Sequence, residues 1–134
     1  TTPFLDAGVF DSDDNRVPLY LRVFHPDHPT LHFVGFLQAV GWGFLPLFET
    51  QARLVAAHLS GAYVLPDPAR MRSAIAADLD RIRRDFVDSS RNRYQMNGAV
   101  YQHECRVELR RGARRAGSGQ EGTRRPGRLA ALGG

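Results

Sequence analysis

The chain has 134 residues, enough for one domain at most, with 18 basic residues against 14 acidic ones and a formal net charge of +4. Every basic residue is arginine, which indicates GC-rich coding more than a selected nucleic-acid surface, where lysine also contacts phosphates. Cys105 is the single cysteine, no apolar run approaches the roughly 20 residues that span a bilayer, and the start of the sequence lacks a signal peptide. These features exclude an intrachain disulfide and predict a cytoplasmic protein without a membrane partner.

Two segments in the first third of the chain predict β-strands. Residues 19–24 place alternate apolar side chains on one face, as a half-buried strand does. Residues 25–30 hold two prolines, which lack the backbone donor that a strand ladder needs, so they predict a connector. Residues 31–37 are almost uniformly apolar and rich in strand-forming types, which is typical of a strand buried on both faces in a parallel sheet.

Two later segments predict helices. Pro46 suits a first helical turn, so the first helix should cover residues 46–60, with a glycine directly after it as the C-terminal stop. An N-capping Asp67 followed by Pro68 starts a second helix that should reach about Ser89. The residues expected to face the core are Phe48, Ala52, Val55 and Leu59 in the first helix and Met71, Ile75, Leu79, Ile82 and Phe86 in the second.

The rest of the chain gives weaker structural signals. Residues 94–109 are ambiguous and compatible with a third helix. After Arg110 the composition changes to Arg, Gly and Ala, which cannot bury enough apolar surface to offset the entropy of ordering the chain, so we expect disorder there. Eight arginines lie between Arg106 and Arg128 without an aromatic platform for base stacking, so we expect no specific nucleic-acid partner.

Two glycine-rich motifs have either the spacing or the context of a nucleotide-binding turn. GSGQEG, at residues 117–122, matches the G-x-G-x-x-G pattern, but no strand precedes it, so we interpret it as a compositional accident. GWGFLP, at residues 41–46, is a poorer match in a better context, because it lies between a predicted strand and a predicted helix. This turn either joins the two elements in the ordinary way or brings the backbone close to a cofactor, and its Trp42 is either a core residue or a pocket wall.

Titratable residues cluster at two places without the spacing of a familiar catalytic or metal site. The first cluster consists of His25, Asp27, His28 and His32. Two prolines interrupt it, and no set of three or four ligands with a typical spacing emerges. His103 and Cys105 are sequence neighbours, which makes a poor nucleophile–base pair, and no second cysteine completes a zinc site. We therefore predict no metal site and assign no catalytic residue.

Several sequence segments occur in a characteristic order between residue 3 and about residue 95. They are PFLDAGVF, PLYLRVFHPDHPTLHFVG, FVGFLQ, PLFETQAR, HLSG and LPDPARM. This order resembles the C-terminal part of flavin-containing monooxygenases. The resemblance implies an α/β, Rossmann-like flavoprotein with two dinucleotide-binding domains, to which this chain contributes strands, two helices and a disordered tail. Residues 1–65 would be the C-terminal portion of the FAD-binding domain, residues 66–105 a helical segment, and residues 106–134 an Arg/Gly-rich tail.

The resemblance also implies cofactors and a site. It implies FAD, which NADPH reduces, and oxygenation of a small substrate with a nucleophilic nitrogen or sulfur, the cofactor carrying the chemistry. Gly35, Phe36, Leu37 and Gln38 match the family's last FAD-domain strand at the point where it approaches the flavin. By this resemblance Gly35 would permit a close approach to the ring, and Gln38 would hydrogen-bond to its polar edge.

Other matches and departures limit what the resemblance implies. Glu49, Gln51 and Arg53 match the family's helix pattern, and we expect them to be structural. The residue after Gln38 is Ala39, where the family more commonly has proline. The glycine motifs that bind FAD and NADP are absent from the sequence, so we expect a fragment that is inactive alone and depends on a missing N-terminal portion of the enzyme. The alternatives are a Baeyer–Villiger or N-hydroxylating relative, or a non-enzymatic basic interaction module.

Overall fold

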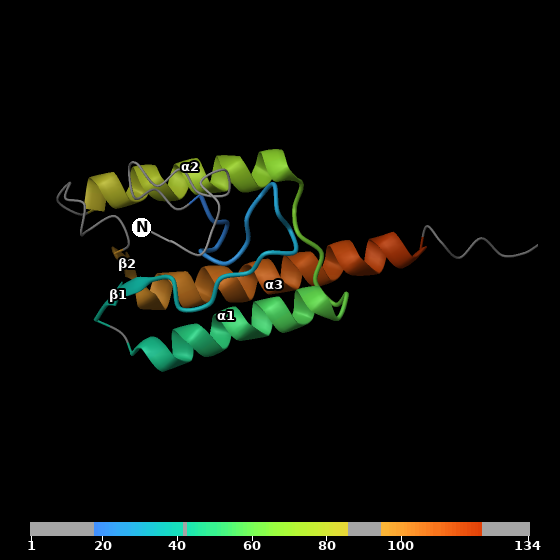
Figure 1. Cartoon of the computed structure of the whole chain (residues 1–134), viewed down its shortest axis with the longest axis horizontal. Coiled ribbons are helices and arrows are strands. Elements are labelled where there is room, and N and C mark those ends of the chain that lie inside the picture. The colour runs from blue at the N-terminus through green and yellow to red at the C-terminus, as the bar shows by residue number, and fades with distance from the viewer. Residues whose placement is uncertain (1–17, 42, 86–94, 122–134) are drawn as a thin grey trace, which may run out of the picture.

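A computed structural model of the chain describes residues 18–41, 43–85 and 95–121. In chain order its elements are strand β1 (Gln38–Val40), helix α1 (Phe44–Leu59), helix α2 (Pro68–Asp85), strand β2 (Gln95–Asn97) and helix α3 (Gly98–Glu121), as Figure 1 shows. The described chain is therefore mostly helical, and its sheet consists of two short strands. The α/β prediction overestimates the strand content of this part of the protein.

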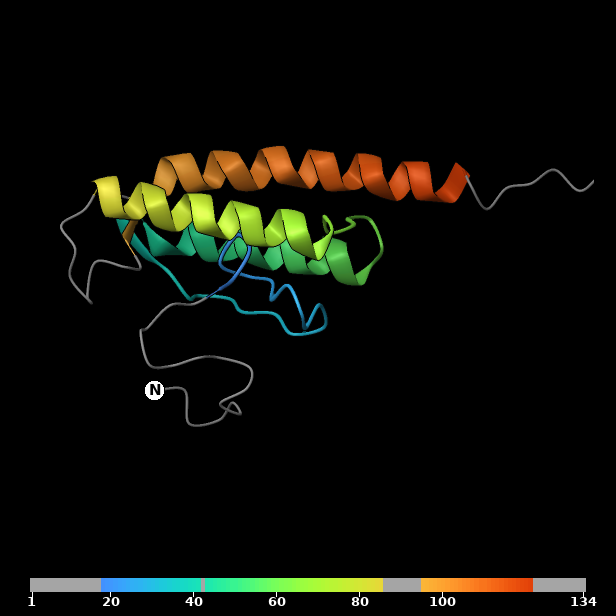
Figure 2. The same cartoon turned by 90° about the horizontal axis from the view of Figure 1, so that it is seen from above.

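The arrangement of the helices follows from the parallel pairing of the two strands. β1 and β2 pair with Gln38 opposite Gln95 and Val40 opposite Asn97. A helix follows each strand, so α1 and α3 begin at the same end of the molecule and run side by side in the same direction (Figures 1 and 2). α3 has 24 residues against 16 in α1 and continues past its end. In Figure 1, residues 18–37, coloured blue to cyan, lie between α2 at the top and α1 at the bottom.

Residues 18–37 form much of the core although they contain little regular structure. The buried core cluster consists of Tyr20, Val23, Phe24, Leu37, Leu47, Leu54, Tyr63, Met71, Met96, Tyr101 and Cys105. Phe24 is fully buried, and its ring stacks on Tyr63 with the centroids 5.9 Å apart. Because the cluster takes members from every helix, this irregular segment joins the three described helices into one core.

The buried face of α1 differs from the predicted one. The sequence predicts Phe48, Ala52, Val55 and Leu59 on the core face. The fully or almost fully buried residues are instead Leu47, Gln51 and Leu54. Ala52 is exposed, and 71% of the surface of Leu59 is accessible. Phe48 and Val55 are partly buried and pack against the core as predicted, so the prediction is wrong only for Ala52 and Leu59. It places only apolar residues inside, whereas the polar Gln51 belongs to the most buried stripe and shifts that stripe by one residue.

Both ends of α1 agree closely with the prediction. The helix begins at Phe44, two residues before the predicted start, because Gly43 in an extended conformation takes the N-cap position. It ends at Leu59, with Ser60 as the C-cap. Gly61 follows with a φ of +76°, a left-handed conformation that glycine adopts without strain, so it is the predicted C-terminal stop.

α2 confirms the predicted helix start and core face. The Asp67 carboxylate accepts a 2.9 Å hydrogen bond from the amide N–H of Arg70, which is the N-cap bond, and the proline follows at the first helical position. Met71 and Ile82 are buried on the predicted stripe. Residues 86–89, into which the prediction extends the helix, lie outside the described residues.

Residues 19–24 form a tight turn and not the predicted strand. Leu21 and Arg22 have φ values of +51° and +57°, two successive left-handed residues, as in type I′ turns. Tyr20 and Phe24 close the turn through two backbone hydrogen bonds of 2.8 and 3.0 Å. The alternating pattern fails to predict this turn because leucine and arginine rarely occupy left-handed positions.

Residues 31–37 are also largely irregular, contrary to the predicted buried strand. In the described chain this segment pairs only through an isolated bridge between Phe24 and His32. Gly35 then adopts a φ of +88°, which interrupts the extended conformation. The strand that leads into α1 therefore begins after this glycine, at Gln38.

α3 confirms a third helix and corrects the expectation for the tail. It begins at a cap formed by Asn97, whose side-chain oxygen accepts hydrogen bonds from the amides of Ala99 and Val100 at 3.1 and 3.2 Å. The predicted disorder after Arg110 is wrong up to Glu121, where the helix ends. Residues 122–134 lie outside the described residues.

A contact with Tyr63 orders the part of α3 that composition predicts to be disordered. The Tyr63 ring lies against Gly112 so closely that a Cβ at that glycine would be 1.9 Å from ring atom Cδ2. Arg115 reaches back from the next turn, where its Nε donates a 2.9 Å hydrogen bond to the Val64 carbonyl and its guanidinium lies 5.9 Å from the centre of the Tyr63 ring. Glycine is needed here because it alone leaves room for the ring.

The exposed surface of the helices is strongly charged. α3 exposes Arg106, Arg110 and Arg114, and on α2 the exposed Arg83 pairs with Asp80 at 3.5 Å. Exposed pairs of this kind contribute about 0–1 kcal/mol each. None of the described helices combines the length and the apolar character that crossing a bilayer requires.

Replacing Gly112 by alanine should destabilise the chain by up to about 2 kcal/mol. The added methyl group overlaps the Tyr63 ring, which costs about 1–3 kcal/mol, and alanine in a helix interior offsets about 1 kcal/mol of this cost. Urea denaturation followed by circular dichroism measures the change. Gly117→Ala is the matched control, since open space surrounds that position of the same helix, and it should be neutral or stabilising. Equal destabilisation by both variants would contradict the Tyr63 contact.

Candidate functional site

The four predicted cofactor-contacting residues lie where the irregular segment leads into β1. Gly35 is exposed and left-handed, with a φ of +88°. Phe36 is half-buried, and Leu37 is buried in the core. Gln38 opens β1 with an exposed side chain. Gly35 and Gln38 are therefore accessible to another molecule, while Leu37 anchors the segment between them.

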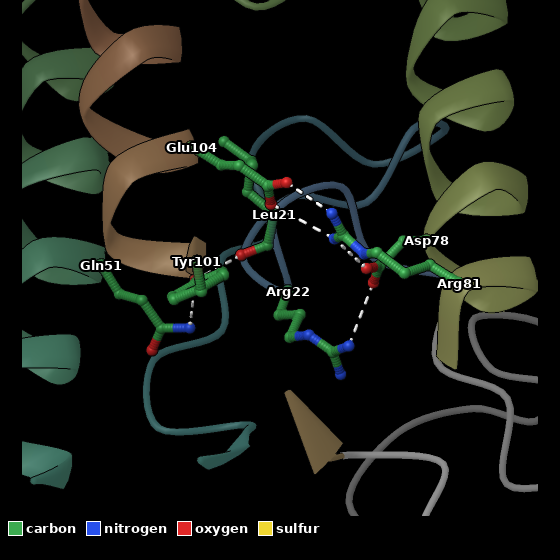
Figure 3. A network of polar contacts seen from close by, with 7 residues as sticks. All are labelled: Leu21, Arg22, Gln51, Asp78, Arg81, Tyr101 and Glu104. Carbon is green, nitrogen blue, oxygen red and sulfur yellow. Dashed lines mark hydrogen bonds and ion pairs between the residues drawn. The ribbon is translucent and has the colours of Figure 1, made fainter. Parts of the chain in front are cut away.

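A buried glutamine of α1 holds Gly35 in place. Gln51 is fully buried, and its Oε1 accepts a 2.8 Å hydrogen bond from the Gly35 amide N–H. Its Nε2 donates a 2.9 Å hydrogen bond to the hydroxyl oxygen of Tyr101 on α3, as Figure 3 shows. Leaving one end of such a buried amide without a partner costs about 1–3 kcal/mol. Gln51 therefore fixes the position of Gly35 relative to both α1 and α3.

Tyr101 connects this amide to the turn at residues 19–24. Its hydroxyl donates a 2.6 Å hydrogen bond to the Leu21 carbonyl and accepts the one from Gln51 (Figure 3). Burial raises the pKa of Tyr101 well above its usual value, and the neighbouring Cys105 raises it further, so the hydroxyl keeps its proton. The tyrosine therefore remains the donor to the turn.

The turn that receives this hydrogen bond is strained. Leu21 and Arg22 are both left-handed, which costs about 1–2 kcal/mol for each residue other than glycine. Tyr101 binds the carbonyl of the first residue, and Asp78 of α2 binds the side chain of the second, with 3.0 Å between Arg22 Nη2 and Asp78 Oδ2. Strained backbone persists only where surrounding contacts over-determine it, and here two independent contacts do so.

Charged side chains link the turn to α2 and α3. Asp78 accepts hydrogen bonds from Arg22 at 3.0 Å and from Arg81 at 2.7 Å. Arg81 also donates to both carboxylate oxygens of Glu104 on α3, at 2.5 and 3.3 Å (Figure 3). These side chains are partly exposed, so each pair adds little stability alone. Together they fix the position of α2 relative to α3 and to the turn.

A pocket of about 600 Å³ opens between α2 and α3 beside these ion pairs. Its walls include Leu21, Arg22, Ile75, Arg81, Glu104 and Val107. The volume lies in the range of small-molecule sites, which combine apolar walls with a few polar groups. None of the four predicted cofactor-contacting residues lines it, so the pocket is separate from the Gly35 surface.

The GWGFLP turn has the context that the sequence predicts. A parallel strand precedes it and α1 follows it, although that strand is β1 and not residues 31–37. Gly41 is left-handed, with a φ of +70°, and Gly43 provides an N-cap without a side-chain hydrogen bond. Trp42 lies outside the described residues. The glycines of the other motif, Gly117 and Gly119, lie near the C-terminal end of α3, so the motif does not form the strand-to-helix turn that phosphate binding needs.

The remaining candidate residues do not assemble a reactive site. The rings of His25 and His28 lie 4.8 Å apart, yet within the described residues no group of three or more His, Cys, Asp or Glu could hold a metal ion. His103 is exposed whereas Cys105 is buried. Burial raises the pKa of the Cys105 thiol to about 12, so it is a poor nucleophile near neutral pH.

The described residues fit the ring of a flavin better than its phosphates. Gly35 presents an exposed backbone without a side chain, and because Gln51 already binds its N–H, it can approach a flat ring by contact alone. Gln38 adds an exposed amide for a polar ring edge. The first turn of α1 follows the glycine turn but exposes Phe44 and Leu45, which suit an apolar neighbour and not a pyrophosphate.

Comparison with known proteins decides the family. Residues 1–111 match the model of the flavin-binding monooxygenase-like family. The chain belongs to this family. The match includes residues 35–38 as well as Gln51 and Tyr101, and it ends one residue before Gly112.

Relatives of this family member occur in animals and plants. The chain is 37% identical over 75 residues to flavin-containing monooxygenase 1 of Rattus norvegicus, which is 54% of this chain and 14% of the relative. It is 31% identical over 109 residues to a second protein of that species, dimethylaniline monooxygenase (N-oxide-forming) 2, covering 80% and 20%. It is 42% identical over 85 residues to flavin-containing monooxygenase FMO GS-OX-like 2 of Arabidopsis thaliana, covering 60% and 17%. The chain thus spans 14 to 20% of the length of these three relatives.

The structure also shows which site residues the sequence fails to reveal. The structural role expected for Gln51 is confirmed, and its neighbours Glu49 and Arg53 form an exposed ion pair at 2.6 Å. Tyr101 and the left-handed Leu21 carry no recognisable signal. For Gln51 a signal exists, because it lies four residues after Leu47 and three before Leu54, the spacing of a buried helix face.

Cys105 offers a test of how firmly the helices enclose this network. With its pKa raised to about 12, the native thiol should react with iodoacetamide at neutral pH about a thousandfold more slowly than the same thiol in urea-unfolded chain. Mass spectrometry of the alkylated fraction over time measures both rates. The native rate should rise as the pH increases toward 12. Native labelling as fast as that of the unfolded chain would contradict the buried position on α3.

Proposed function

We propose that the chain is the C-terminal part of an FAD- and NADPH-dependent monooxygenase that oxygenates substrates with a nucleophilic nitrogen or sulfur. Membership of the flavin-binding monooxygenase-like family supports a flavin and an oxygenation reaction. One relative is named an N-oxide-forming dimethylaniline monooxygenase. That name supports oxygenation at nitrogen in this protein over the Baeyer–Villiger alternative, in which oxygen is inserted beside a carbonyl carbon.

The observation that carries the proposal is the exposed and fixed backbone at Gly35. Its left-handed conformation and the 2.8 Å hydrogen bond to Gln51 hold a stretch without a side chain at the surface. When bound, FAD supplies the oxygen-activating chemistry. Gly35 would pack against the flavin ring and Gln38 would hydrogen-bond to its polar edge, while the buried Leu37 holds both residues in position.

The phosphates of both cofactors require other parts of the protein. A pyrophosphate site needs a glycine-rich turn whose helix N-terminus faces the phosphates, and the first turn of α1 exposes Phe44 and Leu45 instead. The chain spans only 14 to 20% of the relatives described above. We therefore propose that the two dinucleotide-binding domains lie largely outside this chain and that the missing N-terminal portion is its partner. The chain alone then neither binds FAD tightly nor turns over substrate.

A chimera tests this function. In dimethylaniline monooxygenase 2 of the rat, the segment that matches this chain is replaced by the chain itself. We expect the purified chimera to retain FAD and to consume NADPH when N,N-dimethylaniline is added. The 134-residue chain should do neither, as measured by FAD fluorescence and NADPH absorbance. A chain that binds FAD and oxidises NADPH alone, or a folded chimera without flavin, would overturn the proposal.

Within the chimera, Gly35→Val should weaken FAD retention by about tenfold or more. The valine Cβ would lie 3.8 Å from the Phe48 ring, its methyl groups would hinder the proposed approach of the flavin, and a β-branched residue is strained in a left-handed conformation. Gly61→Val is the matched control, because it introduces the same strain at a φ of +76°, in open space at the end of α1. Equal loss of FAD in both variants would show that strain alone, and not contact with the ring, explains the effect.

A further inference from the structure

The side chains of Gln51 and Tyr101 connect two surfaces that the proposed function treats separately. One is the exposed backbone at Gly35, and the other is the strained turn at Leu21 and Arg22, which lines the pocket between α2 and α3. We propose that Gln51 and Tyr101 act as a positioning relay, which holds Gly35 in its left-handed conformation only while the turn is docked on Tyr101. The part of this inference that concerns the flavin rests on the proposed function, whereas the coupling between turn and Gly35 does not.

The relay has a single possible direction of hydrogen bonding. The Leu21 carbonyl can only accept a hydrogen bond, and the Gly35 amide N–H can only donate one. Tyr101 must therefore give its proton to the turn, which leaves its oxygen to accept from Gln51 Nε2. Gln51 presents Oε1 to the Gly35 N–H and Nε2 to the tyrosine oxygen, so the three hydrogen bonds are satisfied together only in this arrangement.

Loss of the turn would leave the proton of the Tyr101 hydroxyl without the Leu21 carbonyl that accepts it. The Tyr101 side chain would then be held less firmly, and with it the Gln51 amide that donates to its oxygen. The Gly35 N–H still requires Gln51 Oε1, but the glutamine that presents this oxygen would no longer be fixed from its other end. Both side chains are buried, with 0% and 5% of their surfaces accessible, so water cannot readily supply the missing partners.

The turn itself is held from the opposite side by α2. Arg22 donates a 3.0 Å hydrogen bond to Asp78, and Asp78 also accepts from Arg81, which binds Glu104 on α3. Two left-handed residues without glycine stay docked only while such contacts persist. A change at Asp78 should therefore alter Gly35 by way of Arg22, the turn, Tyr101 and Gln51.

Amide hydrogen exchange of the full chain, measured by NMR, tests the relay without any cofactor. The readout is the exchange rate of the Gly35 amide divided by that of the Ser60 amide, which donates to Ala56 in α1. A loss of global stability accelerates both amides, so the ratio reports the local effect. Tyr101→Phe leaves the bond between Gln51 and Gly35 itself untouched, yet it should raise the ratio about three- to tenfold.

The matched control is Tyr63→Phe, which removes the hydroxyl of another buried tyrosine, bonded to Glu108 at 3.3 Å and outside the relay. It should leave the ratio unchanged. An unchanged ratio in Tyr101→Phe, or an equal rise in both variants, overturns the relay.

A second variant, Asp78→Asn, changes a partly exposed side chain of α2 at the other end of the relay and leaves the core residues unchanged. Asp78→Asn should raise the ratio in the otherwise unchanged chain and have no further effect when Tyr101→Phe is present. Asp27→Asn, which weakens the exposed ion pair with Arg72, is its control and should not alter the ratio. Additive effects of Asp78→Asn and Tyr101→Phe would overturn the relay. Where Tyr101→Phe is too unstable to measure, an unchanged ratio in Asp78→Asn overturns it instead.

The flavin part is tested separately in the chimera. Tyr101→Phe should change the visible circular dichroism of bound FAD, and Tyr63→Phe should not. A raised exchange ratio with an unchanged flavin spectrum supports the relay and overturns the proposed contact between Gly35 and the ring. An unchanged exchange ratio overturns the relay. The proposed monooxygenase function is not affected by that result, because the activity of the chimera tests it separately.

Discussion

An amide side chain buried in an apolar core must find partners for both of its ends, and the fold of this chain depends on how Gln51 meets that requirement. Its oxygen binds the irregular segment at Gly35, and its nitrogen binds α3 at Tyr101, while its own backbone belongs to α1. An apolar residue at the same position would pack against the helices but would leave the Gly35 amide without a protein partner. The buried glutamine thus joins three parts of the chain at one point.

The energetic balance around the turn at residues 19–24 shows why the hydrogen bonds of Gln51 and Tyr101 are needed. Two left-handed residues cost about 2–4 kcal/mol together. A typical hydrogen bond contributes only about 0.5–1.5 kcal/mol net, so the bond from Tyr101 does not offset the strain alone. Burial of Tyr20, Val23 and Phe24, at about 1.5–3 kcal/mol for each large apolar side chain, supplies the larger part. Hydrophobic burial stabilises the turn, and hydrogen bonds decide its conformation.

The sequence correctly predicts the structural features that residues close together in the chain determine. The cap at Asp67, the glycine stop after α1 and the core stripe of α2 all follow from residues within one or two turns of each other. The turn at Leu21 depends instead on Tyr101, 80 residues away, and the order of the end of α3 depends on the fit of Tyr63 against Gly112. No local pattern contains these contacts, so the predicted strand at residues 19–24 and the predicted disorder of residues 111–121 are wrong for a physical reason.

The candidate site divides in the same way. The resemblance to flavin-containing monooxygenases selects residues 35–38 from sequence, and the family match confirms the family. Only the structure shows that Gly35 is left-handed, that its amide binds Gln51 and that the side chain of Gln38 is exposed. A glycine in an apolar segment signals a close backbone approach, but the sequence does not say which partner holds it.

The hydrogen bond between the Gly35 amide and Gln51 can be tested directly by a long-range HNCO experiment on the isotope-labelled chain, which detects scalar coupling across a hydrogen bond. We predict a cross-peak between the Gly35 amide and the side-chain carbonyl carbon of Gln51, because that oxygen lies 2.8 Å from the amide nitrogen. A cross-peak from Gly35 to a backbone carbonyl would contradict the account, since it would place residues 31–37 in an ordinary strand and leave Gln51 without its central role.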